Sequence, residues 1–112
     1  MIESYSFGSI TVDGVNYRTD VIVYPGRTRD GWWRKKGHDL YRDDIGEILD
    51  YGPDLLIIGT GKFGRMRVGA EIKNLIQQRG IELIVKRTSE AVRVFNELYT
   101  KKKTVAAFHL TC

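Results

Sequence analysis

Three short apolar segments separated by two amphipathic ones constrain the fold of this chain more than any other feature. The apolar runs predict strands near 55–58, 82–85 and 104–109, and their lack of polar alternation is typical of strands buried on both faces. Between them, apolar residues recur at helical spacing and predict helices over 66–79 and 88–102. Strands connected through helices pair in parallel, so this half of the chain predicts a βαβαβ core with right-handed crossovers.

The first third of the sequence is rich in strand-forming residues. Residues 9–12 and 15–17 flank Asp13-Gly14, a pair suited to the positive φ angles of a type I′ turn, and this predicts an antiparallel hairpin. We expect the second hairpin strand to continue through 21–24 until Pro25-Gly26 ends it.

A short helix is expected between the two parts. Asp44 followed by Glu47 resembles a capping box, and Gly52-Pro53 ends the pattern, which gives a helix over about 44–51. Thr88 is expected to cap the last helix. The predicted fold class is α+β with an α/β-like core: one three-layer domain over residues 1–112, with an N-terminal antiparallel hairpin and parallel strands after it.

Composition excludes several protein classes. With 42% hydrophobic and 29% charged residues the chain is typical of a globular protein. Its apolar runs of about four residues are far below the roughly 20 needed to span a bilayer. The N-terminal residues match no targeting signal, so we expect a cytoplasmic location. The single cysteine, Cys112, cannot form an internal disulfide and does not suggest a zinc site.

The positive charge is concentrated in one segment. Residues 26–42 hold six basic and two acidic side chains, which equals the whole net charge of +4. Two tryptophans lie within it, and large aromatic area with planar cations is typical of protein interfaces and of some nucleic-acid surfaces. We therefore predict a partner surface formed by Arg27, Arg29, Trp32, Trp33, Arg34, Lys35 and Lys36. Replacing the bases at 34–36 is expected to change stability little. One of the two tryptophans can instead belong to the core. The structural alternative to a partner surface is that both tryptophans cover the exposed edge or face of the N-terminal hairpin, with the bases keeping the loop soluble.

A glycine-rich turn follows the first buried strand. Residues 59–64 fit the pattern G-x-G-x-x-G and are expected to open a helix, where amides and the macrodipole favour an anion. The predicted anion-binding residues are Gly59, Thr60, Gly61, Lys62, Gly64 and Arg65. Lys86-Arg87 occupies the place where a dinucleotide site needs an acid, so a dinucleotide is not predicted. The alternative is that the glycines only permit a tight turn.

Other chemically suggestive residues have structural explanations. His109 and Cys112 differ by an odd number of positions and would face opposite sides of a continuing strand, which argues against a nucleophile and base pair. Asp43 and Asp44 are explained by their place at a helix start, and His38 by solvation. We predict no catalytic residue, no metal site and no cofactor.

Several short segments occur in a distinctive order along nearly the whole chain. They are Tyr5-Ser6-Phe7-Gly8, Asp13-Gly14, Asp20 through Pro25, Trp33-Arg34, His38, Leu55–Ile58 with Gly59-Thr60-Gly61, Phe95-Asn96 and Thr111-Cys112. This order resembles one protein family, which is shared by a cytosolic adipogenesis-associated protein, a mitochondrial respiratory complex I assembly factor and uncharacterised archaeal and bacterial proteins. The resemblance implies the three-layer fold and no established enzyme activity.

These observations favour a non-enzymatic binding or assembly-accessory domain that recognises another protein, with a small anion as a second ligand. The alternative is an enzyme or binding protein for a small phosphorylated or carboxylated compound at the glycine turn. Weak nucleic-acid binding is a further alternative, to be distinguished by its steep salt dependence. We expect a monomer or homodimer without membrane association.

Overall fold

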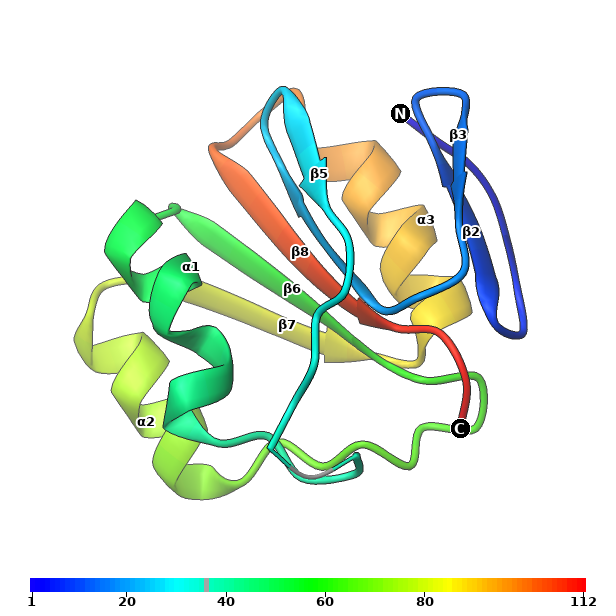
Figure 1. The fold of residues 1–112 in the computed structure, drawn as a ribbon. Helices are drawn as coiled ribbons and strands as arrows, with labels where there is room; N and C mark the ends of the chain where they lie inside the picture. The colour runs from blue at the N-terminus through cyan, green and yellow to red at the C-terminus, as the bar shows by residue number, and fades with distance from the viewer. Residues whose placement is uncertain (36) are drawn as a thin grey trace.

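The computed structural model describes residues 1–35 and 37–112, so Lys36, one of the expected partner-surface residues, lies outside the described residues. A five-stranded sheet with the order β5-β4-β8-β6-β7 forms its centre (Figure 1). Strand β6 (Leu55–Thr60) pairs in parallel with both β7 (Glu82–Lys86) and β8 (Thr104–His109). The connecting helices are α2 (Ala70–Gln78) and α3 (Thr88–Leu98), which confirms the predicted βαβαβ core.

The other half of the large sheet differs from the sequence-based expectation. Strand β4 (Val21–Tyr24) does not extend the first hairpin but pairs antiparallel with β8. All four of its side chains are buried, which requires cover on both faces, and only the centre of the larger sheet provides it. Pro25-Gly26 then forms the turn of a second hairpin, whose other strand is β5 (Arg27–Arg29).

The expected N-terminal hairpin is confirmed and belongs to a separate sheet. Strands β1 (Ile2–Ser6), β2 (Ser9–Val12) and β3 (Val15–Tyr17) form three antiparallel strands. Asp13 and Gly14 have φ angles of 49° and 80°, as a type I′ turn requires.

The large sheet separates two hydrophobic clusters, and this gives the three layers. Helices α1 (Gly46–Tyr51) and α2 cover one face, and α3 with the three-stranded sheet covers the other (Figure 1). Because side chains of a strand alternate between faces, neighbouring residues of β6 enter different clusters: Leu56 contributes to the first and Ile57 to the second. The molecule is a mixed α+β domain.

Helix boundaries depart from the predictions in ways that affect the site. A 3-10 helix, η1 (Arg42–Ile45), precedes α1. Asp44 lies within η1 and does not cap α1; its carboxylate accepts a hydrogen bond from the amide of Tyr41, the residue before η1, at 2.8 Å. Helix α2 begins at Ala70 instead of residue 66, and α3 ends at Leu98 instead of residue 102. Thr88 is the first residue of α3 and makes no cap, because its hydroxyl is used elsewhere.

Candidate functional site

A pocket lies at the edge of the large sheet where its parallel strands end. Strands β6 and β8 end there, and β4 begins there because it runs antiparallel to β8. In open α/β sheets this carboxyl edge is where ligands bind. The pocket has a volume of about 330 Å³. Its lining residues are Arg18, Thr19, Asp20, Trp32, Trp33, Arg34, Gly37, His109 and Thr111.

Asp20 joins three segments of the chain within this pocket. Its Oδ2 lies 2.7 Å from Nη1 of Arg34 and 2.8 Å from Nδ1 of His109, and its Oδ1 accepts a hydrogen bond from the Leu110 amide at 2.7 Å. Burial raises the pKa of Asp20, but the hydrogen bonds from His109 and Leu110 and the charge of Arg34 outweigh burial and hold its pKa below the ordinary value. Asp20 is therefore a carboxylate at neutral pH.

The ionised carboxylate decides how His109 is protonated. Nδ1 of His109 lies 2.8 Å from Asp20 Oδ2 and 2.9 Å from Arg34 Nη2, and it cannot donate to one and accept from the other. Since the carboxylate can only accept, Nδ1 carries the proton, and the short distance to Nη2 is a contact without a hydrogen bond. Nε2 of His109 is buried, and the described residues provide no hydrogen-bond partner for it.

Arg34 is held in a similarly buried position. Its side chain is 5% exposed, and its guanidinium lies 4.8 Å from the centre of the Trp32 ring. Nη1 forms an ion pair with Asp20 without the alignment of a hydrogen bond, and Nε has no partner among the described residues. The burial of Arg34 contradicts the premise that the bases at 34–36 contribute little to the folded structure. Replacing Arg34 is now expected to lower stability, because Asp20 would lose its counter-charge.

The two tryptophans have different environments. Trp32 is 3% exposed, packs in the hydrophobic cluster under α1 and donates from Nε1 to the Asp44 carbonyl at 2.9 Å. Trp33 is 80% exposed. Trp32 is therefore a core residue, and Trp33 is a surface residue.

The remaining bases of the expected partner surface are spread over the molecule. Arg27 lies 4.3 Å above the Tyr24 ring, and Arg29 pairs with Glu47 at 3.0 Å, both on the edge strand β5. Lys35 is exposed, and its amide donates to Asp44 Oδ1 at 2.9 Å. Arg27 pairs with Tyr24 at the far end of β4 from Asp20, so the predicted residues do not form one continuous surface.

The glycine turn does not open a helix. Residues 61–69 form a loop before α2, so the argument from helix amides and the macrodipole does not apply to them. Several amides of the turn already have partners: Lys62 donates to the Thr111 carbonyl at 2.6 Å, Arg65 to the Cys112 backbone oxygen at 3.0 Å, and Gly64 to the Gly61 carbonyl at 3.2 Å. Anion binding at residues 59–65 therefore stays a prediction, and it no longer has the support of a helix N-terminus.

Close packing accounts for two of these glycines. A Cβ at Gly59 would lie 2.8 Å from Thr88 Oγ1, and one at Gly61 would clash with the carbonyl carbon of Cys112. Thr88 fixes this junction by accepting from the Gly61 amide at 2.8 Å and donating to the His109 carbonyl at 2.6 Å. The glycines allow the end of β6, the start of α3 and the last residues of the chain to approach one another.

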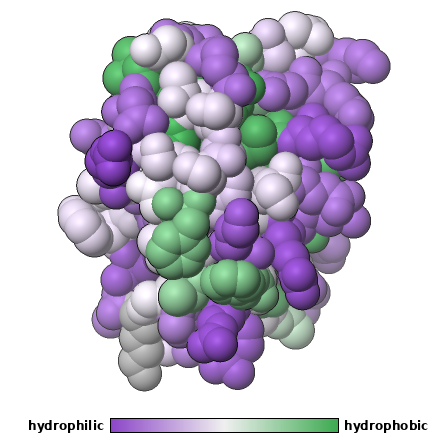
Figure 2. Space-filling model, turned by 90° about the vertical axis from the view of Figure 1, so that its right-hand side faces the viewer, coloured by the Kyte–Doolittle hydropathy of each residue, from purple (hydrophilic) through white to green (hydrophobic). Residues whose placement is uncertain are grey.

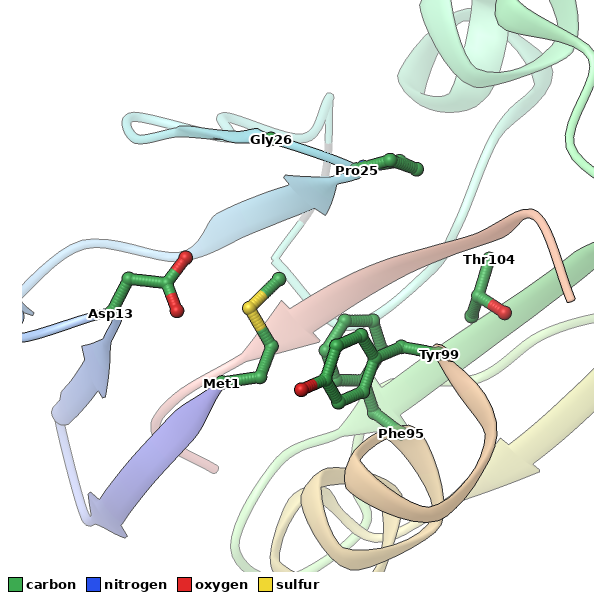
Figure 3. A pocket seen from close by; sticks show the side chains of 7 residues that line it. All are labelled: Met1, Asp13, Pro25, Gly26, Phe95, Tyr99 and Thr104. Atoms are coloured by element: carbon green, nitrogen blue, oxygen red, sulfur yellow. The ribbon is translucent and has the colours of Figure 1, made fainter. Parts of the chain in front are cut away.

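A second pocket of about 330 Å³ lies at the opposite edge of the sheet. Phe95 of α3 and Tyr99, which directly follows that helix, face the side chain of Met1 across it (Figure 3). Its other lining residues are Asp13, Pro25, Gly26 and Thr104. None of the residues singled out as a site from the sequence lies in it. Within residues 1–35 and 37–112, no group of three or more His, Cys, Asp or Glu side chains is placed to hold a metal ion.

Sequence reasoning missed the central residue of the first pocket. Asp20 was not considered as a site residue, and His109 was weighed only against Cys112. The usable signal was positional: Asp20 immediately precedes a strand and His109 ends another, and antiparallel pairing of those two strands brings the positions together.

Comparison with known proteins identifies the family. A model described as a protein of unknown function (DUF498/DUF598) matches residues 2–110. The chain belongs to this family. The chain is also similar over its whole length to the crystal structure of a conserved hypothetical protein, PH1505, from Pyrococcus horikoshii. The two sequences are 32% identical, the TM-score is 0.87, and the match covers 100% of this chain and 99% of the other.

Two more distant structures share the fold of this DUF498/DUF598 protein. A Mth938-like domain protein of Bordetella pertussis is 17% identical with a TM-score of 0.72, over 98% of this chain and 85% of its own. A protein of Bartonella henselae described as an outer membrane protein is 22% identical with a TM-score of 0.83, over 99% and 94%. In the part of the chain that the structure describes, no helix is long and apolar enough to cross a bilayer.

Proposed function

We propose that this domain recognises another protein through the carboxyl edge of its sheet, with Trp33 at the centre of the contact. The observation that carries the proposal is the fixed position of this exposed residue. Trp32 before it is in the core and Arg34 after it is buried and ion-paired, while the Trp33 amide donates to the Gly31 carbonyl at 2.9 Å. An exposed tryptophan on a rigid backbone loses little conformational entropy on binding, and tryptophan is enriched among the residues that dominate binding energy.

Two further exposed aromatic residues lie near the same edge. Phe7 is 52% exposed and Phe63 59%, and their ring centres are 6.3 Å apart. Thr111 connects this pair with Trp33, because its carbonyl accepts from the amide of Lys62, the neighbour of Phe63, and the residue lines the Trp33 pocket. Figure 2 shows hydrophobic side chains side by side in the lower part of the face that carries the small sheet, among hydrophilic ones. Neighbouring exposed apolar groups of this kind mark interaction surfaces.

Basic side chains surround these aromatic residues and suggest the chemistry of the partner. Arg18, Lys62 and Arg65 are exposed near the edge, and the described residues offer none of them an ion pair. Uncompensated charge at the rim of an interface steers a partner of opposite charge. The proposed partner is a protein surface with an apolar centre and acidic residues around it.

The expected kinship with an adipogenesis-associated protein and a complex I assembly factor agrees with this proposal, because an assembly factor acts by binding other proteins.

The proposal also includes a cytoplasmic location, which imaging of a fluorescent fusion would test.

Site-specific photo-crosslinking in cells tests the proposal. A photoreactive phenylalanine at position 33 is expected to form a protein adduct, and the same group at Val15, which is 52% exposed on the small sheet, is the matched control and should form none. With the captured partner purified, Trp33→Ala should weaken binding by about 30-fold, as for a hot-spot residue, and Phe63→Asp should also weaken it. Equal adducts at both positions would contradict the proposal.

Salt dependence separates protein from nucleic acid. Affinity for a protein partner anchored by Trp33 should fall only modestly between about 50 and 200 mM salt, whereas a loss of about 10³-fold or more would indicate phosphate contacts. The free energy of unfolding of Trp33→Ala should equal that of the wild type within about 0.5 kcal/mol, since the side chain is exposed.

A further inference from the structure

Two buried nitrogen atoms without partners belong to residues that line the pocket beside Trp33. Nε of Arg34 and Nε2 of His109 are both shielded from solvent, and no described residue accepts from or donates to them. Buried polar groups are almost always hydrogen-bonded, and an exception calls for a specific explanation. Both side chains belong to the pocket, so a ligand that enters it can supply the missing partners.

The charge of the pocket favours an anion. Arg34 and Arg18 contribute two positive charges and Asp20 one negative charge, so these three side chains leave one positive charge in excess. The Nε–H of a guanidinium can only donate, so its partner must be an acceptor. Guanidinium groups bind carboxylates particularly well, because the hydrogen bonds are charge-assisted.

The shape and the wall of the pocket limit the size of the ligand. A volume of about 330 Å³ is at the small end of ligand sites. Trp32 and Trp33 are both among its lining residues, and aromatic rings pack favourably against an exposed indole such as that of Trp33. Because the unpartnered nitrogens are shielded, side chains at the mouth must move for a ligand to reach them, and Trp33 is the most exposed large hydrophobic side chain of the described residues.

We propose that this pocket binds a small aromatic carboxylate, with its carboxylate accepting from Arg34 Nε and Arg18 and its ring packing against Trp33. This site takes a different ligand from the protein contact proposed above, although both involve Trp33 and Arg18. A single buried water that accepts from Arg34 and donates to His109 would also satisfy the two nitrogens, and the experiment is chosen to distinguish these cases.

Titration with benzoate, followed by NMR of the ¹⁵N-labelled protein, tests the proposal. The Arg34 Nε–H and His109 imidazole signals should shift and saturate with a Kd of roughly millimolar, as expected for so small a ligand. Benzamide has the same shape without the charge and is the matched control ligand. It should produce little shift at the same concentration.

Variants locate the binding. Arg18→Gln should weaken benzoate binding by about tenfold, because it removes one charge-assisted contact at the mouth. Arg93→Gln, on the exposed face of α3 where it pairs with Glu90 and Glu97, is the matched control and should leave binding unchanged. Equal shifts with benzoate and benzamide, absent shifts at Arg34, or equal effects of the two variants would overturn the proposal and leave a buried water as the partner of the two nitrogens. Protein binding through Trp33 would be unaffected by that result.

Discussion

At the scale of single residues, Asp20 is the group on which the carboxyl edge depends. It is the common partner of Arg34, His109 and the Leu110 amide, so one carboxylate connects the Trp33 loop, β8 and the last residues of the chain. Removing one member of a buried ion pair leaves the other charge uncompensated, which costs more than the pair itself contributes.

Asp20→Asn should therefore lower the free energy of unfolding at pH 7 by about 3 kcal/mol. The pKa of Asp20 lies below its ordinary value in the folded protein, so its contribution is present above about pH 4 and is lost as the pH falls through the folded-state pKa. The difference between wild type and variant, measured by urea denaturation, should be largest near neutral pH and shrink as the pH falls below about 4. A difference that stays constant with pH would show that Asp20 is not preferentially ionised in the folded state.

At the scale of elements, the loop after β6 holds the last residues of the chain. The amides of Lys62 and Arg65 donate to Thr111 and Cys112, and the Gly8 amide from the β1–β2 turn donates to Leu110 at 2.9 Å. Gly61 permits this contact, since its φ of 104° and its distance to Cys112 leave no place for a Cβ.

Gly61→Ala should destabilise the protein by about 3 kcal/mol, because it combines backbone strain with a clash against main-chain atoms. Gly46→Ala in α1 is the matched control: its φ is −54°, nothing lies within 4 Å of the added Cβ, and alanine is the better helix former. Thermal denaturation should show a lower Tm for the first variant and an unchanged or higher Tm for the second. Similar effects of both would argue against the close contact with Cys112.

At the scale of the whole molecule, one sheet connects both hydrophobic clusters. Neighbouring residues of β4, β6 and β8 contribute to opposite faces, so neither cluster can be lost without disturbing strands that the other requires. Separate unfolding of the two faces is therefore not expected.

In a Trp33→Phe variant, the remaining Trp32 fluorescence reports on the cluster under α1, while far-UV circular dichroism reports on all helices and strands, including α3. The two urea transitions should coincide, with the same midpoint and slope. A Trp32 transition at clearly lower urea would show that the face with α1 unfolds independently.

The sequence allowed the parts of the fold that rest on local patterns to be predicted, and not those that rest on distant pairing. Periodicity between residues 55 and 109 was enough for three strands and two helices, and Asp13-Gly14 for a hairpin. Nothing local distinguishes a longer hairpin strand from β4, whose partner is 87 positions away where Val21 pairs with Phe108. The same limit applies to the site, since Asp20 and His109 are 89 positions apart. A basic segment likewise does not reveal which arginine is buried.

The position of β8 within the large sheet has a consequence for the order of synthesis. This strand leaves the ribosome after all the others, yet it lies between β4 and β6 and is the only link between the two halves of the five-stranded sheet among the described residues. A nascent chain that ends before Thr104 would expose the apolar edges of β4 and β6 at once, and such unpaired edges readily associate with other chains. Until the final strand emerges, the growing polypeptide is therefore open to association with chaperones or with its neighbours on the same polysome.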